Sequence, residues 1–294
     1  MRWDQFRRSD NVEDTRGQGG MPGGAGGLGI GTIVVLGLIG WALGIDPRVL
    51  IQGAEDLSQG QPSQYERQNP ARTGTPEDRV GQFVAAVLGD TEDRWTEIFT
   101  QTGRTYRAPK LRLFSGAAQS ACGFAKSAMG PFYCPRDQRV YLDTSFFTDL
   151  QTRFHGCNPK QCEFAEAYVI AHEVGHHVQN LLGTLPKVTE MQHAVDRTSA
   201  NRLQVKVELQ ADCYAGIWAQ HSESKWKFIE PGDVEAALRT AAAIGDDRLE
   251  RQAQGYVVPD SFTHGTSAQR TRWLSNGLKS GALPRCDTFN AAQL

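Results

Sequence analysis

Residues 172–176 read HEVGH, and they lie in a segment whose apolar residues recur with helical periodicity. From residue 163 to 182 the apolar side chains form one stripe, and Gly183, a residue type that commonly ends helices, follows it. Positions four apart lie on one face of an α-helix, so His172 and His176 point the same way. Two imidazoles at this spacing can bind one metal ion, which constrains the fold because the ion needs a further ligand from elsewhere in the chain.

Zinc is the metal that this pattern indicates. In a His-Glu-x-x-His helix both histidines bind Zn²⁺, and the glutamate holds a water molecule and takes its proton. The sequence therefore predicts His172 and His176 as zinc ligands and Glu173 as the general base. His177 points away from this face, and we expect it to bond to backbone or solvent. A pair of ordinary histidines on a helix face is the alternative interpretation.

Such a site needs a third protein ligand, with water in the fourth position. His193 is too far along the chain to serve, whereas Glu208 lies on the next segment with helical periodicity. Asp212 follows one turn later on the same face, where it could accept a hydrogen bond from the second ring nitrogen of a zinc-bound histidine. A solvated acidic face is the alternative. Lys206 supports that alternative, but the apolar residues after Asp212 indicate burial.

Two runs of residues carry a resemblance to a known family. Residues 172–179 (HEVGHHVQ) and 208–216 (ELQADCYAG) resemble the bacterial neutral zinc metallopeptidases, and the likeness extends over nearly the whole chain. The resemblance implies a zincin-like fold, a zinc ion and hydrolysis of peptide bonds in a peptide or protein substrate. More distantly, the Glu-x-x-x-Asp spacing is similar to that of gluzincins, including membrane-bound zinc proteases that cut prenylated proteins.

The distant likeness to gluzincins implies roles for a histidine and an arginine near the carboxyl end. His264 would donate to the oxyanion of the tetrahedral intermediate, and Arg270 would brace the site. Gly265 stands where those relatives usually have proline, and Arg272 competes with Arg270 for the bracing role. A loop residue near a helix cap is the alternative interpretation of His264.

One uncharged apolar run, residues 28–45 (LGIGTIVVLGLIGWALGI), is long enough to cross a bilayer as a helix. We expect an uncleaved anchor in the bacterial inner membrane. A cleaved signal peptide is the alternative, which the long polar stretch before the run and Pro47 after it disfavour. More arginines precede the run than follow it, so the positive-inside rule predicts a single-pass protein whose catalytic domain is periplasmic or extracellular.

All six cysteines lie beyond this apolar run, and an even set in an exported domain predicts disulfides. Six cysteines allow fifteen pairings. Local spacing favours two of the pairs and leaves the third: Cys122–Cys134, Cys157–Cys162 and Cys213–Cys286. A cysteine zinc cluster is the alternative, but the spacings contain no paired Cys-x-x-Cys knuckles.

The chain divides by composition into a polar amino-terminal part and a folded remainder. We expect a disordered cytoplasmic tail over residues 1–27, the anchor over 28–45, a linker over 46–74 and the peptidase domain over 75–294. The net charge is −2, and no basic patch interleaves with aromatic residues, so we expect no nucleic acid partner. The sequence contains no signal for an oligomeric state.

Within the domain, a helix start at residues 75–78 and a second short helix after residues 90–91 are expected first. Residues 110–114 and 139–143 alternate like strands, and we expect residues 139–143 to form the edge at which a substrate pairs; an interior strand is the alternative. Helices dominate the second half, so the fold class is α+β, mostly helical with a small sheet and one transmembrane helix before it.

The sequence therefore predicts a membrane-anchored zinc peptidase that acts outside the cytoplasm. The alternative is a membrane-tethered binding or chaperone module whose zinc is structural. The presence of Glu173 favours the peptidase, because a structural zinc site does not require a general base.

Overall fold

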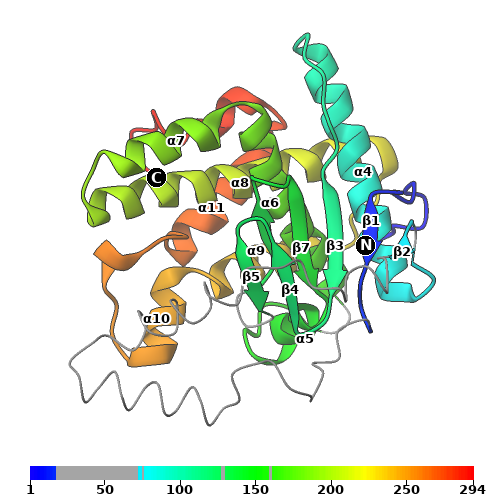
Figure 1. The fold of residues 1–294 in the computed structure, drawn as a ribbon, viewed down its shortest axis with the longest axis horizontal. Helices are drawn as coiled ribbons and strands as arrows, with labels where there is room; N and C mark the ends of the chain where they lie inside the picture. Colours follow the sequence, from blue (N-terminus) through cyan, green and yellow to red (C-terminus); the bar gives the residue numbers. More distant parts are fainter. Residues whose placement is uncertain (18–71, 75, 127–129, 159–160) are drawn as a thin grey trace, which may run out of the picture. The chain divides into compact units, whose positions relative to one another are not determined.

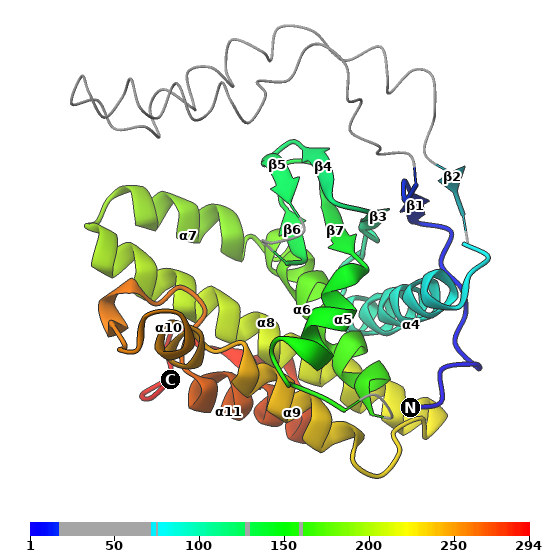
Figure 2. The same cartoon turned by 90° about the horizontal axis from the view of Figure 1, so that it is seen from below.

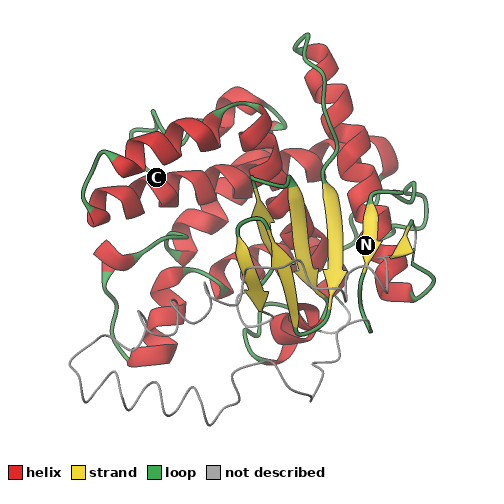
Figure 3. Ribbon diagram, in the orientation of Figure 1, coloured by secondary structure: helices red, strands yellow, loops and turns green. Residues whose placement is uncertain are grey.

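A computed structural model of the 294-residue chain describes residues 1–17, 72–74, 76–126, 130–158 and 161–294. A mixed sheet forms one layer of the fold (Figures 1 and 3). Its strands, in spatial order, are β2 (Arg72–Thr73), β1 (Val12–Asp14), β3 (Lys110–Phe114), β7 (Arg139–Asp143) and β6 (Phe132–Cys134). Strands β1, β3 and β7 run parallel, while β2 and β6 are antiparallel to their neighbours. A separate hairpin joins β4 (Ala117–Ser120) to β5 (Gly123–Lys126).

Helices form the rest of the fold, stacked on one side of the sheet (Figure 2). They are α4 (Arg79–Gln101), α5 (Ser145–Thr152), α6 (Cys162–Leu181), α7 (Thr184–His193), α8 (Arg197–Trp226), α9 (Asp233–Ala243), α10 (Asp246–Gln254) and α11 (Ser267–Ser280). Helix α6, which carries the HEVGH motif, packs against β6 and β7 and against α4, α8 and α9. Helix α8 in turn packs against α11. The mostly helical fold with a small mixed sheet confirms the predicted α+β class.

Helix α6, the metal-motif helix, packs closely against α8 because residue 175 is a glycine. A side chain on Gly175 would place its Cβ 3.0 Å from the carbonyl oxygen of Ala211 on α8. Since real Cβ atoms rarely tolerate that distance, the absent side chain allows α6 and α8 to approach. This close approach places the two helical faces that carry the predicted zinc ligands against each other.

The edge strands of the five-stranded sheet are β2 and β6, so the prediction that residues 139–143 form an edge is wrong. Those residues are β7, which pairs with β3 on one side and with β6 on the other. Four of the five residues of β7 are buried, as expected for an interior strand. Strand β6 has only three residues, too few to show a recognisable alternation in the sequence. The longer strand β7 does show one, which is why the edge was predicted there.

The first helix of the domain is longer and starts later than expected. Thr75 lies outside the described residues, and Asp78 caps α4 by accepting a hydrogen bond from the backbone N–H of Gly81 at 3.0 Å. No second helix starts at Asp90, because α4 continues through it. The buried Asp90 carboxylate instead accepts hydrogen bonds from α8, through the indole N–H groups of Trp218 and Trp226, each at 2.9 Å.

The amino-terminal residues belong to the folded unit, which comprises residues 1–16 and 72–294. Trp3 and Phe6 are buried, and the ring of Phe6 lies 5.2 Å from that of Phe228. Glu13 in β1 forms an ion pair with Arg112 of β3. The prediction of a disordered tail over residues 1–27 is therefore wrong for residues 1–16, because a few apolar side chains in this polar segment supply anchors to the core. Residues 18–27 lie outside the described residues.

The predicted location is also wrong. Among the described helices, none combines the length and the apolar character that a bilayer crossing needs. The predicted anchor at residues 28–45 and nearly all of the linker at 46–74 lie outside the described residues. One crossing there would put residues 1–16 and 72–294 on opposite sides of a membrane, whereas the structure packs them together. These findings overturn the single-pass inner-membrane protein with a periplasmic or extracellular domain.

Three disulfides connect the cysteines in the predicted pairs: Cys122–Cys134, Cys157–Cys162 and Cys213–Cys286. The third closes the longest loop, and it ties α8 to the short 3-10 helix Leu283–Cys286 near the end of the chain. Gly277 of α11 lies against the carbonyl group of Cys213, so α11 also reaches α8 at this point. The carboxyl-terminal segment and α11 therefore both hold α8 in place near Cys213.

Glu166 on α6 makes the stability of the fold dependent on pH. Burial raises the pKa of Glu166 from 4.5 to about 7, and the nearby charge of Glu163 adds to this. The pKa of Glu166 is higher in the folded chain than in the unfolded chain, so the protonated form stabilises the fold. This stabilisation is fully present below about pH 4.5 and is lost as the pH rises through 7. We predict that Glu166→Gln raises the free energy of unfolding at pH 8 by up to about 3 kcal/mol, and much less at pH 5.

Urea unfolding of the disulfide-bonded chain at the two pH values measures this difference. Glu190→Gln, at an exposed position on α7, is the matched control and should have little effect at either pH. An equal gain for Glu166→Gln at pH 5 and pH 8 would show that the ionised carboxylate is not the cause.

Candidate metal centre

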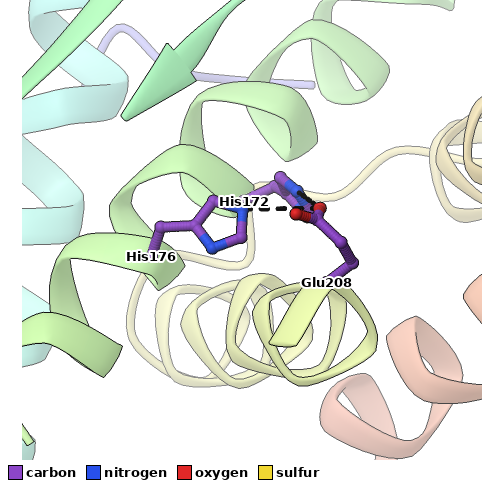
Figure 4. Close-up of side chains that lie close together, drawn as sticks. All are labelled: His172, His176 and Glu208. Atoms are coloured by element: carbon purple, nitrogen blue, oxygen red, sulfur yellow. Dashed lines mark hydrogen bonds and ion pairs between the residues drawn. The ribbon is translucent and has the colours of Figure 1, made fainter. Parts of the chain in front are cut away.

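The structure brings His172 and His176 of α6 together with Glu208 of α8 (Figure 4). One possible ligand atom from each residue lies within 4.8 Å of the others. The Nε2 atom of His172 is 3.2 Å from Glu208 Oε2, and the Nε2 atom of His176 is 3.5 Å from the same oxygen. The predicted third ligand thus lies beside the two histidines, and the alternative of an acidic face in solvent is excluded because Glu208 is buried.

These three side chains, which we call the metal triad, fit a zinc ion. Zinc binds nitrogen and carboxylate oxygen at about 2.0–2.2 Å, and tetrahedral geometry then separates neighbouring ligand atoms by roughly 3.3–3.5 Å. The two measured separations to Glu208 Oε2 agree with that value. Two histidines and one glutamate are also a donor set of catalytic zinc sites, which keep a fourth position open.

A buried carboxylate orients His172. The Nδ1 atom of His172 lies 2.8 Å from Asp212 Oδ1, so Nδ1–H donates to Asp212 and leaves the lone pair of Nε2 directed at the triad. The hydroxyl group of Tyr168 donates to the same carboxylate at 2.6 Å. This contact between Asp212 and a histidine was predicted from the sequence. Tyr168 was not predicted, although its place one turn before His172 was an available signal.

Arg270 also binds the Asp212 carboxylate. Its Nε and Nη2 atoms donate to the two oxygens of Asp212, each at 2.9 Å, and all of its side chain is buried. Burial alone would raise the pKa of Asp212, but the charges of Arg270 and His172 outweigh it and hold that pKa well below its usual value. Arg272, the competing candidate, is exposed and contacts the carbonyl oxygen of Leu294 instead.

His176 and Glu208 have their own supports, which sequence reasoning missed. The Nδ1–H group of His176 donates to Gln179 Oε1 at 2.9 Å, and the amide of Gln179 donates to the carbonyl oxygen of Val207 at 2.7 Å. Gln204 donates to Glu208 Oε1 at 2.9 Å. Gln179 follows His176 by three residues and Gln204 precedes Glu208 by four, so helical spacing was the signal that could have identified both.

Glu173 is buried beside the triad and lines the same cavity of about 600 Å³ as His172, His176 and Glu208. Burial raises the pKa of the Glu173 carboxyl, although the two histidines partly oppose this. A carboxylate at the wall of this cavity, beside the three possible ligand atoms, is placed to accept a proton from a group that enters the cavity.

His264 lines this cavity as well, with half of its side chain exposed. Asp246 at the start of α10 fixes its position. Asp246 Oδ2 accepts the backbone N–H groups of Thr263, His264 and Gly265 at 2.8, 2.6 and 2.9 Å, and Oδ1 lies 3.2 Å from His264 Nδ1. The ring is therefore held by Nδ1, and its other nitrogen is left for a partner. Asp246 was not predicted, because it is 18 residues from His264 in the sequence.

His177 is directed away from the triad, as the sequence predicted. Its Nε2–H donates to the carbonyl oxygen of Arg107 at 2.6 Å, so its Nδ1 accepts from the hydroxyl group of Tyr133 at 2.9 Å. Burial lowers the pKa of His177 to about 4, which keeps the ring neutral. The side chain of Asn180 also donates to Tyr133, at 3.0 Å. These bonds attach β6 to the metal-motif helix.

The fold is mostly helical with a small mixed sheet, and His172, His176 and Glu208 form a cluster that could hold a metal ion. Over residues 1–289 the chain matches the family described as "Putative neutral zinc metallopeptidase", and it belongs to that family. The resemblance recognised in residues 172–179 and 208–216 is thereby confirmed.

The chain is similar to proteins from Escherichia coli and from two mycobacteria. The chain is 44% identical over 300 residues to "Uncharacterized protein YpfJ" of Escherichia coli (strain K12), covering 98% of this chain and 99% of the relative. It is 41% identical over 233 residues to "Uncharacterized protein Rv2575" of Mycobacterium tuberculosis and to "Uncharacterized protein Mb2605" of Mycobacterium bovis, covering 76% of this chain and 75% of each relative. No solved structure matches the chain significantly.

The hydrogen bond from His172 to Asp212 yields a prediction about metal affinity. We predict that Asp212→Asn weakens zinc binding about 10–100-fold, because the amide no longer accepts from His172 as a charged partner. Competition with a chromogenic chelator measures the dissociation constant directly. Asp260→Asn, at an exposed position, is the control and should leave it unchanged. Equal affinities for Asp212→Asn and the wild-type chain would refute the orienting role of Asp212.

Proposed function

We propose that this protein is a zinc-dependent peptidase that hydrolyses peptide bonds in peptide or protein substrates. The observation that carries the proposal is the position of Glu173, buried next to three converging ligand atoms at the wall of an open cavity. A ligand triad supplies a metal site, and an adjacent carboxylate supplies a base. Their common exposure to one cavity gives a substrate access to both.

Zinc held by His172, His176 and Glu208 would polarise the scissile carbonyl group and lower the pKa of a water molecule. Glu173 accepts the proton of the attacking water and passes it to the leaving amine. Asp212 and Arg270 act through the ligands, since they keep the imidazole of His172 in the tautomer that presents a free Nε2.

His264 would donate a hydrogen bond to the carbonyl oxygen as negative charge develops on it. Partial burial lowers the pKa of His264, but its hydrogen bond to Asp246 and the charges of Glu208 and Asp246 outweigh this and raise the pKa above its usual value. Nδ1 is held by Asp246, which leaves Nε2 as the donor. Asp246 is then a positioning residue for His264.

The backbone of β6 is the proposed docking strand for the substrate. Among the described residues, β6 has a strand partner on one side only, and residues 130–133 line the cavity that contains the triad. An extended peptide can add to such an edge through main-chain hydrogen bonds, which position it without restricting its sequence. This assignment replaces the one that the sequence suggested for residues 139–143.

A structural zinc site in a binding or chaperone module is the competing function. Structural zinc sites are closed by four protein ligands. Here the described residues supply three ligand atoms in one cluster, next to Glu173 and to a cavity of about 600 Å³. These features support the peptidase over the alternative.

Glu173→Gln tests the central assignment. We predict that it binds zinc like the wild-type chain and lowers kcat for an unfolded reporter protein by at least about 100-fold, because the amide cannot accept a proton. Zinc content is measured by elemental analysis, and hydrolysis by the appearance of new termini in mass spectrometry. A metal chelator should abolish wild-type activity. Undiminished hydrolysis by zinc-loaded Glu173→Gln would end the assignment of the base.

The pair of His264 and Asp246 yields a coupled prediction. We expect His264→Ala to lower kcat about 100–1000-fold with a small effect on KM, because the donor acts on charge that develops in the transition state. Asp246→Asn should lower kcat less, but it should cause no further loss when His264 is already alanine. Zinc content and the thermal midpoint are measured in parallel. Independent, additive losses would show that Asp246 does not act through His264.

A further inference from the structure

Two buried glutamine side chains connect the metal triad to a distant segment of the chain. Gln179 on α6 and Gln210 on α8 are buried where these helices pack together, with exposed fractions of 0% and 6%. The amide of Gln179 donates to Oε1 of Gln210 at 3.1 Å, and the amide of Gln210 donates to the carbonyl oxygen of Cys286 at 3.0 Å. Since Gln179 also accepts from His176, the four residues form one chain of hydrogen bonds, which we call the amide relay.

The direction of every bond in the amide relay is fixed from its far end. A backbone carbonyl oxygen can only accept, so Cys286 requires the NH2 group of Gln210 and leaves Oε1 of Gln210 for Gln179. The NH2 group of Gln179 then donates twice, to Gln210 and to the carbonyl oxygen of Val207 at 2.7 Å. Its Oε1 is left as an acceptor, which matches a proton on Nδ1 of His176 and leaves Nε2 free for a metal ion.

The segment that contains Cys286 is attached to α8 on both sides of Gln210. The disulfide to Cys213 lies three residues after Gln210 on the helix. Four residues before Gln210, the carbonyl oxygen of Lys206 accepts a hydrogen bond from the hydroxyl group of Thr288 at 2.7 Å. Cys286 and Thr288 are both fully buried, so the acceptor at the end of the amide relay has a fixed position.

The two histidine ligands therefore have supports of different kinds. His172 donates to the charged carboxylate of Asp212, whereas His176 donates to a neutral amide. An amide can rotate by a half turn and present its NH2 group instead, which would repel the Nδ1–H group of the ring. Gln210 opposes that rotation, because both hydrogens of the Gln179 amide already have acceptors. A rotated amide would leave buried polar groups without partners, which costs free energy.

We infer that Gln210 is a positioning residue for the metal centre, which acts through Gln179 to hold His176 in its metal-binding orientation, with the backbone of Cys286 as the fixed acceptor. Gln210 is not among the described residues that line the cavity, so its effect is on the metal site rather than on a substrate. The segment around Cys286, 76 residues from Gln210 in the sequence, thereby affects metal affinity as well as stability.

Two substitutions at Gln210 separate this role from a general effect on stability. Gln210→Met has a similar length but loses both bonds, so we expect zinc to bind about 3–10-fold more weakly, and the zinc-free chain to have a lower thermal midpoint. Gln210→Glu keeps an oxygen that accepts from Gln179 in either protonation state, so its zinc affinity should stay within about twofold of the wild-type value. Its thermal midpoint should still fall, because an ionised carboxylate cannot donate to Cys286.

Thr288→Val is the matched control. It removes the buried hydrogen bond to Lys206 from the same segment, so it should lower the thermal midpoint of the zinc-free chain but leave zinc affinity unchanged. Competition with a chromogenic chelator measures the dissociation constants. The visible absorption of the Co²⁺-loaded chains reports on ligand geometry, and among the three variants it should change only for Gln210→Met.

A wild-type affinity in Gln210→Met, or equal losses of affinity in Gln210→Met and Gln210→Glu, would overturn the inference. An equally large loss in Thr288→Val would also overturn it, since reduced stability would then explain the effect. Zinc binding is measured without a substrate, so these results do not depend on whether the protein is a peptidase.

One measurement needs no variant and applies even if Gln210→Met does not fold. Metal binding at Nε2 makes the Nδ1–H group of His176 a stronger donor, which polarises the amides that follow it. In the NMR spectrum of the wild-type chain, added zinc should therefore shift the side-chain amide resonances of both Gln179 and Gln210. Gln220, whose amide donates to Ser224, is the reference and should not shift. A shift of Gln179 without Gln210 would show that Gln210 is not coupled to the metal.

Discussion

The buried ion pair between Asp212 and Arg270 is the interaction on which the rest of the site depends. It joins α8 to α11, and through Tyr168 and His172 it reaches α6 as well. A buried carboxylate stays ionised only when its oxygens have charged or hydrogen-bonded partners, and Asp212 has three. Loss of Arg270 would leave that charge unpaired next to the metal triad. Stability and metal geometry therefore depend on the same contact.

One short segment serves the site in two ways. His264 lies over the cavity and Arg270 supports Asp212, and the capping box formed by Thr266 and Gln269 at the start of α11 separates them. Asp246 holds the beginning of this segment through three backbone N–H groups. Asp246 at the start of α10 is thus bonded to the loop that leads into α11. This contact fixes the position of His264, the proposed oxyanion donor, next to the helix that carries Arg270.

The sequence was most informative where chemistry follows from spacing within one helix. His172, Glu173 and His176 are such a case, as are Glu208 and Asp212, because helical geometry alone places each set on one face. It was least informative where contacts depend on partners far along the chain. The edge strand was assigned to residues 139–143 because β7 has a clear alternation, but strand order is a property of the whole sheet. The burial of Trp3 and Phe6 was missed because their partners are more than 70 residues away.

The sequence by itself determined the metal-motif helix and the α+β class, because local periodicity encodes both. Spacing indicated the set His172, His176 and Glu208 and favoured one set of disulfide pairs among the fifteen possible ones. Only the tertiary structure decided that Arg270 rather than Arg272 supports Asp212, that Asp246 holds His264, that β6 rather than β7 lies at an edge of the sheet, and that the first sixteen residues join the fold. The physical reason is that these features depend on which side chains become neighbours after packing. Burial then assigns partners to charged and polar groups that a linear sequence leaves open.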